Sequence, residues 1–267
     1  MVICGTLLAE LDPLEEVVSK TLFTFEVAGH TFPFTNHMLM ISIASILMAI
    51  VLPAVILTKK LVPSGFYNVI ETICVFIRED VVRPFLKDQT DRYIGYLWTM
   101  FFFILTLNLL GMIPLNSIIW VFTQKHNNIY GAATANLYVT GALATFAFFL
   151  FHIAGIYQKG FVKYFATLAP KVPWPMMPFM FFMELISSFV RLFSLAIRLF
   201  ANILAGHILL GVLLGFIILF KTYVIATASL VTTTAMSLLE VFVAFLQAYI
   251  FTFLTAIFIG FAVGDEH

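Results

Sequence analysis

The feature that most constrains the fold is a long apolar region near the carboxyl end of the chain. It begins at Met176, ends near Phe261 and is divided at Lys221 into stretches of about 45 and 40 residues. A single helix of about 45 residues is about 67 Å long, whereas the hydrocarbon core of a bilayer is about 30 Å thick. No proline interrupts either stretch beyond its first turn. We therefore predict two long, strongly tilted helices that form a hairpin over residues 176–262.

The composition of the whole chain supports a membrane location. Hydrophobic residues make up 62% and charged residues only 10% of its 267 positions, whereas charged residues make up about 25% of a typical soluble domain. Three further apolar segments, residues 36–58, 93–113 and 137–157, have the ordinary length of membrane-spanning helices. The prediction is an all-α integral membrane protein with about five membrane helices, in a single membrane domain of residues 1–267.

A sixth helix is predicted in the loop between the first two spans. From Phe66 to Val82, apolar residues recur at helical spacing, and charged residues occupy the opposite face. This pattern is typical of an amphipathic helix that lies in the membrane interface. We therefore predict that residues 64–88 form a helix on the inner membrane surface.

The distribution of basic residues predicts the orientation of the spans. Cytoplasmic loops carry an excess of lysine and arginine. The loops on one side contain nine basic residues, and those on the other side contain three, Lys20, Lys125 and Lys221. The nine are Lys59, Lys60, Arg78, Arg83, Lys87, Arg92, Lys159, Lys163 and Lys171. The carboxyl end, Asp265 to His267, is then inside. Residues 1–35 lack the basic and then apolar pattern of a cleaved signal peptide, and we interpret them as a polar outer segment.

Charged and polar residues within the first long stretch follow a regular spacing. Glu184, Arg191 and Arg198 are seven residues apart and therefore share one helical face, which Asn202 extends. Ionisable residues inside a membrane are energetically costly and are functional candidates by default. Two interpretations of Arg191 are open: it pairs with Glu184 or reaches the inner membrane face, or it contributes to function.

Arg198 is the most demanding of these residues. It lies near the middle of its stretch, too far from either end for its side chain to reach water easily. An arginine in that position requires an anionic partner. The two candidates are Glu240 in the second stretch and a carboxylate on a different protein.

His207, Glu240 and Gln247 form a second candidate group. His207 points about half a helical turn away from Arg198, and Glu240 and Gln247 share one face of the second stretch. The hairpin brings His207 and Glu240 within a turn or two of each other, and imidazole and carboxylate groups can act as a proton relay. The alternatives are that His207 binds a backbone carbonyl, and that Asn202 and Gln247 serve only as interhelical hydrogen bonds.

Four motifs resemble those of one known family. They are NLLGMIP at residues 108–114, TANLYVTGALA at 134–144, SLAIRLFANILAGH at 194–207 and LEVFVAFLQAYIF at 239–251. In this order they are similar to subunit a of the F-type ATP synthase, the stator half of its proton channel, and the resemblance covers most of the chain. It implies that the hairpin packs against a rotating ring of c-subunits, each with a membrane carboxylate.

The resemblance implies roles for the residues of the outer half of the membrane. Arg198 matches the essential arginine, which faces the c-ring carboxylates and separates two half-channels for protons. An outer half-channel then includes His207 and Glu240. Asn202 and Gln247 either belong to this half-channel or hydrogen-bond near Arg198.

For the inner half-channel, the resemblance makes Glu184 the candidate, with Arg191 as a residue that tunes it. The sequence also differs from some members of the family. Some bacterial members carry Glu and His at the positions of His207 and Glu240, so the two residue types are exchanged here. Some members carry an acidic residue at the position of Gly111, and any role of that carboxylate is absent from this chain.

The resemblance further implies partners and a location. The partners are the c-ring, the peripheral-stalk b subunits and membrane lipids, with no nucleic acid. No cofactor or metal is expected, and the chain is expected to have no catalytic site of its own. The expected location is the inner (plasma) membrane of a bacterium, with the mitochondrial inner membrane as the alternative.

Two other functions were compared with this pattern. A secondary transporter usually has an inverted repeat and helices broken by Gly or Pro, and neither is visible in the sequence. A non-conducting membrane scaffold would not need a mid-membrane arginine with a histidine and a glutamate nearby. The pattern therefore favours a proton-channel subunit.

Overall fold

The computed structural model describes residues 19–27, 30–57, 65–113, 132–161, 164 and 174–263. Several features used in the sequence predictions lie outside these residues. They are most of the polar segment 1–35, the loop residues Lys59, Lys60, Lys125, Lys163 and Lys171, the motif residue Pro114, and the carboxyl-terminal Asp265, Glu266 and His267.

The chain divides into two compact units, each made of three segments. The first unit comprises Met1–Met48, Phe103–Thr140 and Arg198–Gln247. The second unit comprises Ala49–Phe102, Gly141–Ile197 and Ala248–His267.

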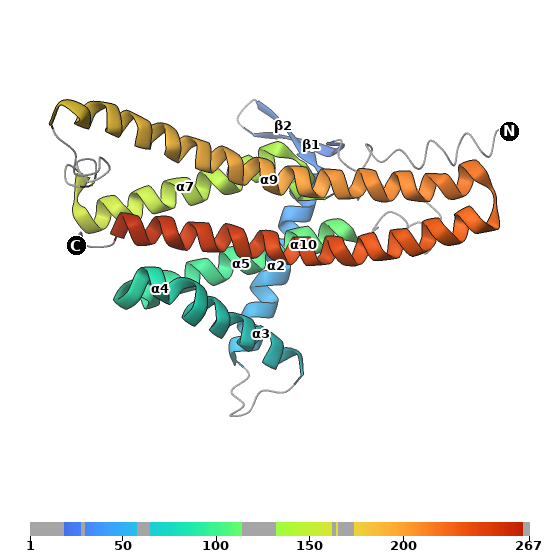
Figure 1. The fold of residues 1–267 in the computed structure, drawn as a ribbon, viewed down its shortest axis with the longest axis horizontal. Helices are drawn as coiled ribbons and strands as arrows, with labels where there is room; N and C mark the ends of the chain where they lie inside the picture. Colours follow the sequence, from blue (N-terminus) through green and yellow to red (C-terminus); the bar gives the residue numbers. More distant parts are fainter. Residues whose placement is uncertain are drawn as a thin grey trace. The chain divides into compact units, whose positions relative to one another are not determined.

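Five long helices account for most of the described residues. In that part of the chain, five helical stretches are long and apolar enough to cross a membrane. Four of them correspond to one long helix each, and the fifth, Tyr67–Met112, also includes the shorter helices that precede the second long helix. The predicted helical membrane fold is therefore confirmed. The helices are α2 (Asn36–Leu57), α5 (Thr90–Met112), α7 (Leu137–Lys159), α9 (Met177–Phe220) and α10 (Tyr223–Val263), which are drawn in Figure 1.

The two longest helices follow each other almost without a connection. α9 has 44 residues and α10 has 41, which confirms the prediction of two long helices. Only Lys221 and Thr222 separate them. Lys221 has a φ of 51°, the left-handed conformation that commonly ends a helix. In the first unit, α9 and α10 run antiparallel from this turn (Figure 1), and the Ser229 hydroxyl donates a hydrogen bond to the carbonyl of Leu213.

A close approach in the first unit explains one glycine of the sequence. A Cβ added to Gly111 would lie 2.6 Å from the Cβ of Ala132, which is closer than carbon atoms can pack. Ala132 itself belongs to a buried cluster with Ala135 and Ile203. The position therefore has no room for the acidic side chain that the family resemblance would have allowed there.

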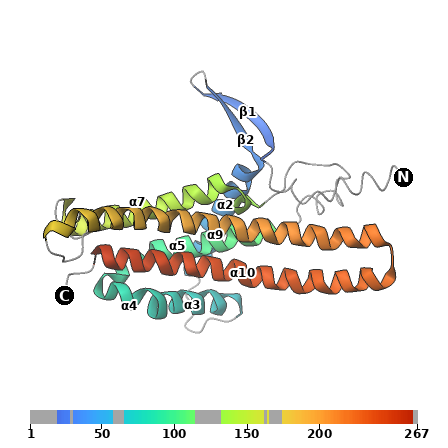
Figure 2. The same ribbon diagram turned by 45° about the horizontal axis from the view of Figure 1, so that its top comes forward.

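A small β-hairpin precedes the first long helix and was not among the sequence predictions. β1 (Thr21–Val27) pairs antiparallel with β2 (His30–Thr35), and the rings of Phe23 and Phe34 stack with centroids 4.7 Å apart. Figure 2 shows the two strands extending away from the beginning of α2. The backbone N–H of Lys20 donates to the side-chain oxygen of Asn36 at 3.1 Å, which ties the residue before β1 to the first residue of α2.

In the second unit, the predicted amphipathic segment is helical. α3 (Phe66–Phe76) continues through a π-helical turn (Ile77–Val82) into α4 (Arg83–Leu86). This wider turn lies just before Pro84, whose ring would clash with the carbonyl of residue 80 in a regular α-helix. Lys87, with a φ of 45°, separates α4 from α5 through a short 3₁₀ turn (Lys87–Gln89).

The apolar face of this segment is only partly covered by protein. Ile77 and Val81 are buried, whereas Val69 is 54% exposed. The indole N–H of Trp98 donates to the carbonyl of Cys74 at 3.0 Å, and this hydrogen bond joins α3 to α5. The predicted helix therefore exists, with part of its apolar face buried and part exposed.

Candidate functional site

The first group of candidate residues lies in the first unit, where α9 and α10 face each other. The side-chain N–H of Asn202 donates to the side-chain oxygen of Gln247 at 3.1 Å. Gln247 is only 2% exposed, and its side-chain nitrogen has no hydrogen-bond partner among the described residues. The two amides thus form the interhelical link that the sequence left open, and one buried amide nitrogen keeps its donor capacity.

Glu240 lies on α10 against the backbone of α9. It is 8% exposed, and a Cβ added to Gly206 would lie 2.2 Å from its Oε1 atom. The carboxyl group of Glu240 can therefore occupy this position only because residue 206 has no side chain. Because Gly206 directly precedes His207, the carboxyl group of Glu240 lies within one turn of His207 along the helix pair, as the sequence predicted.

A hollow of about 200 Å³ opens beside this carboxyl group. It is formed by both helices of the hairpin, and most of its wall is apolar. A water-sized group can enter it, since a single water needs about 30 Å³. The residues that line it are Asn202, Ala205, Gly206, Leu209, Leu210, Met236, Leu239, Glu240 and Val243.

Arg198 lies at the start of the α9 segment that belongs to the first unit. Among the described residues, its guanidinium group forms no hydrogen bond or ion pair, and it forms none with Glu240. The intrachain alternative for its partner is therefore not realised. Every other arginine has a polar partner: Arg78 with Asp91, Arg83 with Glu79, Arg92 with Gln158 and Arg191 with Glu184.

The second group of candidate residues lies in the second unit. Glu184 and Arg191 form an ion pair on one face of α9, which is one of the alternatives that the sequence left open for Arg191. Arg191 also donates from Nε to the carbonyl of Ser187 at 3.2 Å, and its guanidinium lies 5.1 Å from the ring centre of Phe258. The guanidinium group of Arg191 thus contacts groups of both α9 and α10.

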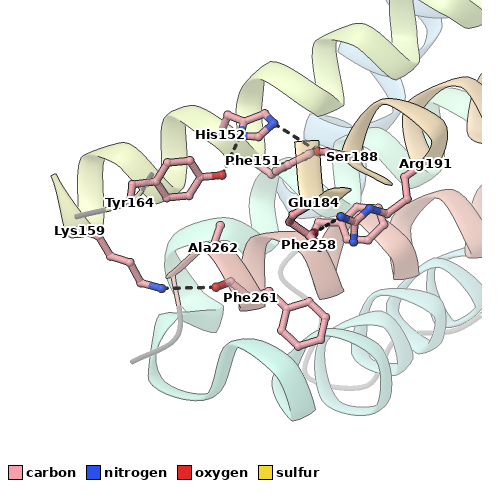
Figure 3. A pocket seen from close by; sticks show the side chains of 10 residues that line it. All are labelled: Phe151, His152, Lys159, Tyr164, Glu184, Ser188, Arg191, Phe258, Phe261 and Ala262. Carbon is pink, nitrogen blue, oxygen red and sulfur yellow. Dashed lines mark hydrogen bonds and ion pairs between the residues drawn. The ribbon is translucent and has the colours of Figure 1, made fainter. Parts of the chain in front are cut away.

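A cavity of about 340 Å³ contains this ion pair. Figure 3 shows its side chains, which come from α7, α9, α10 and the residue Tyr164. The side-chain ammonium group of Lys159, on the cavity wall, donates a hydrogen bond to the carbonyl oxygen of Phe261 at 3.5 Å. The cavity is therefore lined by charged and polar groups on several sides.

The same cavity holds polar residues that the sequence reasoning missed. The Nδ1 atom of His152 lies 2.7 Å from the hydroxyl of Tyr164, and the hydroxyl of Ser188 lies 3.5 Å from its Nε2 atom. Burial raises the pKa of Tyr164 to about 12. His152 could have been found from the sequence, because it is an ionisable residue inside the third predicted span.

The seven predicted residues divide between the two units. Glu184 and Arg191 belong to the second unit. The first unit contains Arg198, Asn202, His207, Glu240 and Gln247.

Comparison with known proteins places this arrangement in a family. The family profile described as ATP synthase A chain matches residues 37–260. The chain is 39% identical over 242 residues to ATP synthase subunit a of Anaeromyxobacter sp. (strain Fw109-5), covering 87% of this chain and 56% of that protein. It is 36% identical over 273 residues to ATP synthase subunit a of Chloroherpeton thalassium, covering 96% of this chain and 78% of that protein.

A third relative, ATP synthase subunit a 2 of Chlorobaculum tepidum, is 38% identical over 251 residues, covering 91% of this chain and 67% of that protein. The chain spans only a little over half the length of the Anaeromyxobacter relative. The family match nevertheless covers all five long helices almost completely. On this coverage, the chain is a multi-pass membrane protein that belongs to the ATP synthase A chain family.

Proposed function

We propose that this chain is the proton-conducting stator subunit of the Fo sector of an F-type ATP synthase. In this role it offers two offset half-channels to the carboxylates of a c-ring, and Arg198 separates them. Proton flow is thereby coupled to rotary ATP synthesis. The observation that carries the proposal is that Arg198, unlike every other arginine, has no polar partner among the described residues.

Electrostatics explains why such an arginine suits a rotary device. A charged side chain at the centre of a membrane costs about 3 kcal/mol or more, and the cost falls when an anion approaches. A ring carboxylate must be neutral when it faces lipid, because burying its charge is too costly. It can ionise only in front of Arg198, which stays protonated at any physiological pH. Protons therefore cannot pass directly between the half-channels and must travel on the ring.

The surface near Arg198 supports the approach of another helix. Ala201 and Ala205, one and two turns further along α9, are exposed. Small residues on a membrane helix allow a second helix to pack closely. A ring helix that docks there would bring its carboxylate close to the guanidinium of Arg198.

The proposed outer half-channel contains Glu240 and His207. Its support is the burial of the Glu240 carboxyl beside Gly206, the residue next to His207, and the adjoining hollow of about 200 Å³. Asn202 and Gln247 contribute a hydrogen-bonded pair of amides to the same region. Such groups can orient water molecules through which protons move.

The proposed inner half-channel contains Glu184. Its support is the cavity of about 340 Å³ in which the Glu184 carboxylate lies. Arg191 binds this carboxylate and is proposed to tune the half-channel.

The proposed setting follows from the same assignment. The chain forms a single membrane domain in the inner (plasma) membrane of a bacterium, with its amino end outside and its carboxyl end inside. Its partners are the c-ring, the peripheral-stalk b subunits and membrane lipids. Nucleotide chemistry takes place on other subunits, and this chain has no catalytic site of its own.

The experiment that tests the proposal is the substitution Arg198→Ala in the assembled ATP synthase. We expect it to abolish ATP-driven proton uptake into inverted membrane vesicles, because the ring carboxylates lose the charge that lets them ionise. Ile197→Ala, an exposed neighbour on the same helix, is the control and should keep most of the uptake. Normal coupled uptake in the Arg198→Ala enzyme would refute the proposal.

A further inference from the structure

The cavity in the second unit contains a polar cluster that the proposed function does not yet use. His152 on α7 lies between two hydroxyl groups, that of Tyr164 at its Nδ1 atom and that of Ser188 at its Nε2 atom. Both hydroxyl residues are almost completely buried, with Tyr164 3% and Ser188 4% exposed. Figure 3 shows these three side chains of the cavity wall pointing toward one another.

The two hydroxyl partners leave the imidazole free to change its protonation state. A backbone carbonyl only accepts hydrogen bonds and would therefore hold one ring nitrogen protonated. A hydroxyl group can donate or accept. Either neutral tautomer of His152, and also the imidazolium ion, can consequently keep both of its neighbours after the hydroxyl hydrogens rotate. This is the property that a proton-carrying histidine needs.

The surroundings provide water and fix the state of the tyrosine. A polar cavity of about 340 Å³ is large enough to hold water molecules. Because burial raises the pKa of Tyr164 to about 12, its hydroxyl keeps its proton at physiological pH. The other ionisable groups on the cavity wall are Glu184, Arg191 and Lys159, and the first two bind each other.

We infer that His152 is a proton relay residue of the inner half-channel, with Tyr164 and Ser188 as its hydrogen-bonding partners. This inference rests on the proposed function of the chain. A proton from cavity water reaches the ring through the hydroxyl at the nitrogen that carries the lone pair: this hydroxyl gives its own proton to the nitrogen and takes one from the water, so the neutral ring becomes imidazolium. The hydroxyl at the other nitrogen then takes the N–H proton and gives its own proton to a second water, and the ring is neutral again. One proton enters and one leaves, and no other group changes its charge.

The competing explanation is that His152 only fills space at the end of α7. The ring lies among Phe148 and Phe151, at centroid distances of 4.3 and 4.4 Å. The Tyr164 ring also packs on Gly155, where an added Cβ would lie 2.2 Å from a ring carbon. A test must therefore remove proton transfer and keep the shape and the hydrogen bonds.

The substitution His152→Gln meets this requirement, because an amide keeps one donor and one acceptor but cannot carry a proton. In the complete ATP synthase, we expect ATP-driven proton uptake to fall about tenfold. The loss is smaller than the 10²–10⁴-fold typical of a positioned proton-transfer group, since cavity water offers a parallel route. Phe151→Leu changes the same wall without removing an ionisable group and should retain nearly normal uptake.

Chemical rescue separates the relay from a structural role. The variant His152→Ala leaves space in the cavity, and added imidazole should raise the proton uptake of this variant several-fold. The increase should grow as the pH rises, because more of the added imidazole is then neutral. Assembly is checked by the amount of the subunit in purified complexes. The inference is overturned if His152→Gln behaves like Phe151→Leu. It is also overturned if an assembled, slow His152→Ala enzyme does not respond to imidazole. Arg198→Ala, measured in parallel, reports on the proposed function independently of His152.

Discussion

At the scale of single residues, Gly206 determines how much room the carboxyl group of Glu240 has. An added Cβ would lie 2.2 Å from its Oε1 atom, 2.9 Å from its Cδ and 3.4 Å from its Cγ. The carboxyl end of Glu240 thus occupies the space that an alanine methyl group at position 206 would fill. Gly206 thus leaves the space that the carboxyl group of Glu240 on the neighbouring helix occupies.

The substitution Gly206→Ala should therefore displace the Glu240 carboxyl and reduce proton uptake by about tenfold. A displacement of about 1 Å at a reacting group can cost even more. Gly215→Ala is the matched control, because it lies on the same helix and an added Cβ has nothing within 4 Å. ATP-driven proton uptake, measured at equal subunit content, distinguishes the two. Equal rates in both variants would show that the contact has no functional role.

The sequence predicted which residues share a helix face better than it predicted their contacts with other helices. Spacing of seven residues put Glu184 and Arg191 on one face and left their pairing open, and the structure shows the ion pair. The contact of Glu240 with Gly206, and the cluster around His152, depend on how different helices pack. Helical periodicity describes one helix at a time, so it contains no information about these contacts.

At the scale of elements, the helices were predictable and their interruptions were not. α9 and α10 follow from long apolar stretches that no proline or polar loop breaks. The β-hairpin was missed, although Phe23 and Phe25 alternate with polar neighbours in the manner of a strand. The π-helical turn Ile77–Val82 was missed too, since a proline predicts a disturbance but not its form.

The helix pair α9–α10 puts the carboxyl group of Glu240 against Gly206, the residue before His207, so a proposed relay between His207 and Glu240 can be tested. If they form one proton-relay pair, exchanging them by His207→Glu with Glu240→His should preserve more proton uptake than either single substitution. Each single change leaves two like groups, whereas the double change restores one imidazole and one carboxyl group. Measuring uptake for all three variants completes a double-mutant cycle. A double variant that is inactive beside active single variants would contradict the pairing.

At the scale of the whole molecule, the residues proposed to carry protons follow one another along the two longest helices in a definite order. Glu184 precedes Arg198 in α9, and His207 follows it toward the turn at Lys221. The proposed proton path therefore has a polarity that depends on how the chain is oriented in the membrane. If the turn at Lys221 lies outside, the group around Glu240 receives protons from the outside and Glu184 delivers them to the inside.

This orientation can be tested with single cysteines. Lys221 and Asp88 are both exposed in the structure, and the excess of lysine and arginine predicts that Lys221 lies outside and Asp88 inside. In a chain whose native Cys4 and Cys74 are replaced by serine, a membrane-impermeant maleimide added to intact cells should label Lys221→Cys and not Asp88→Cys. Inverted vesicles should give the opposite result. Labelling of Asp88→Cys from outside intact cells would reverse the polarity of the path and exchange the two half-channels.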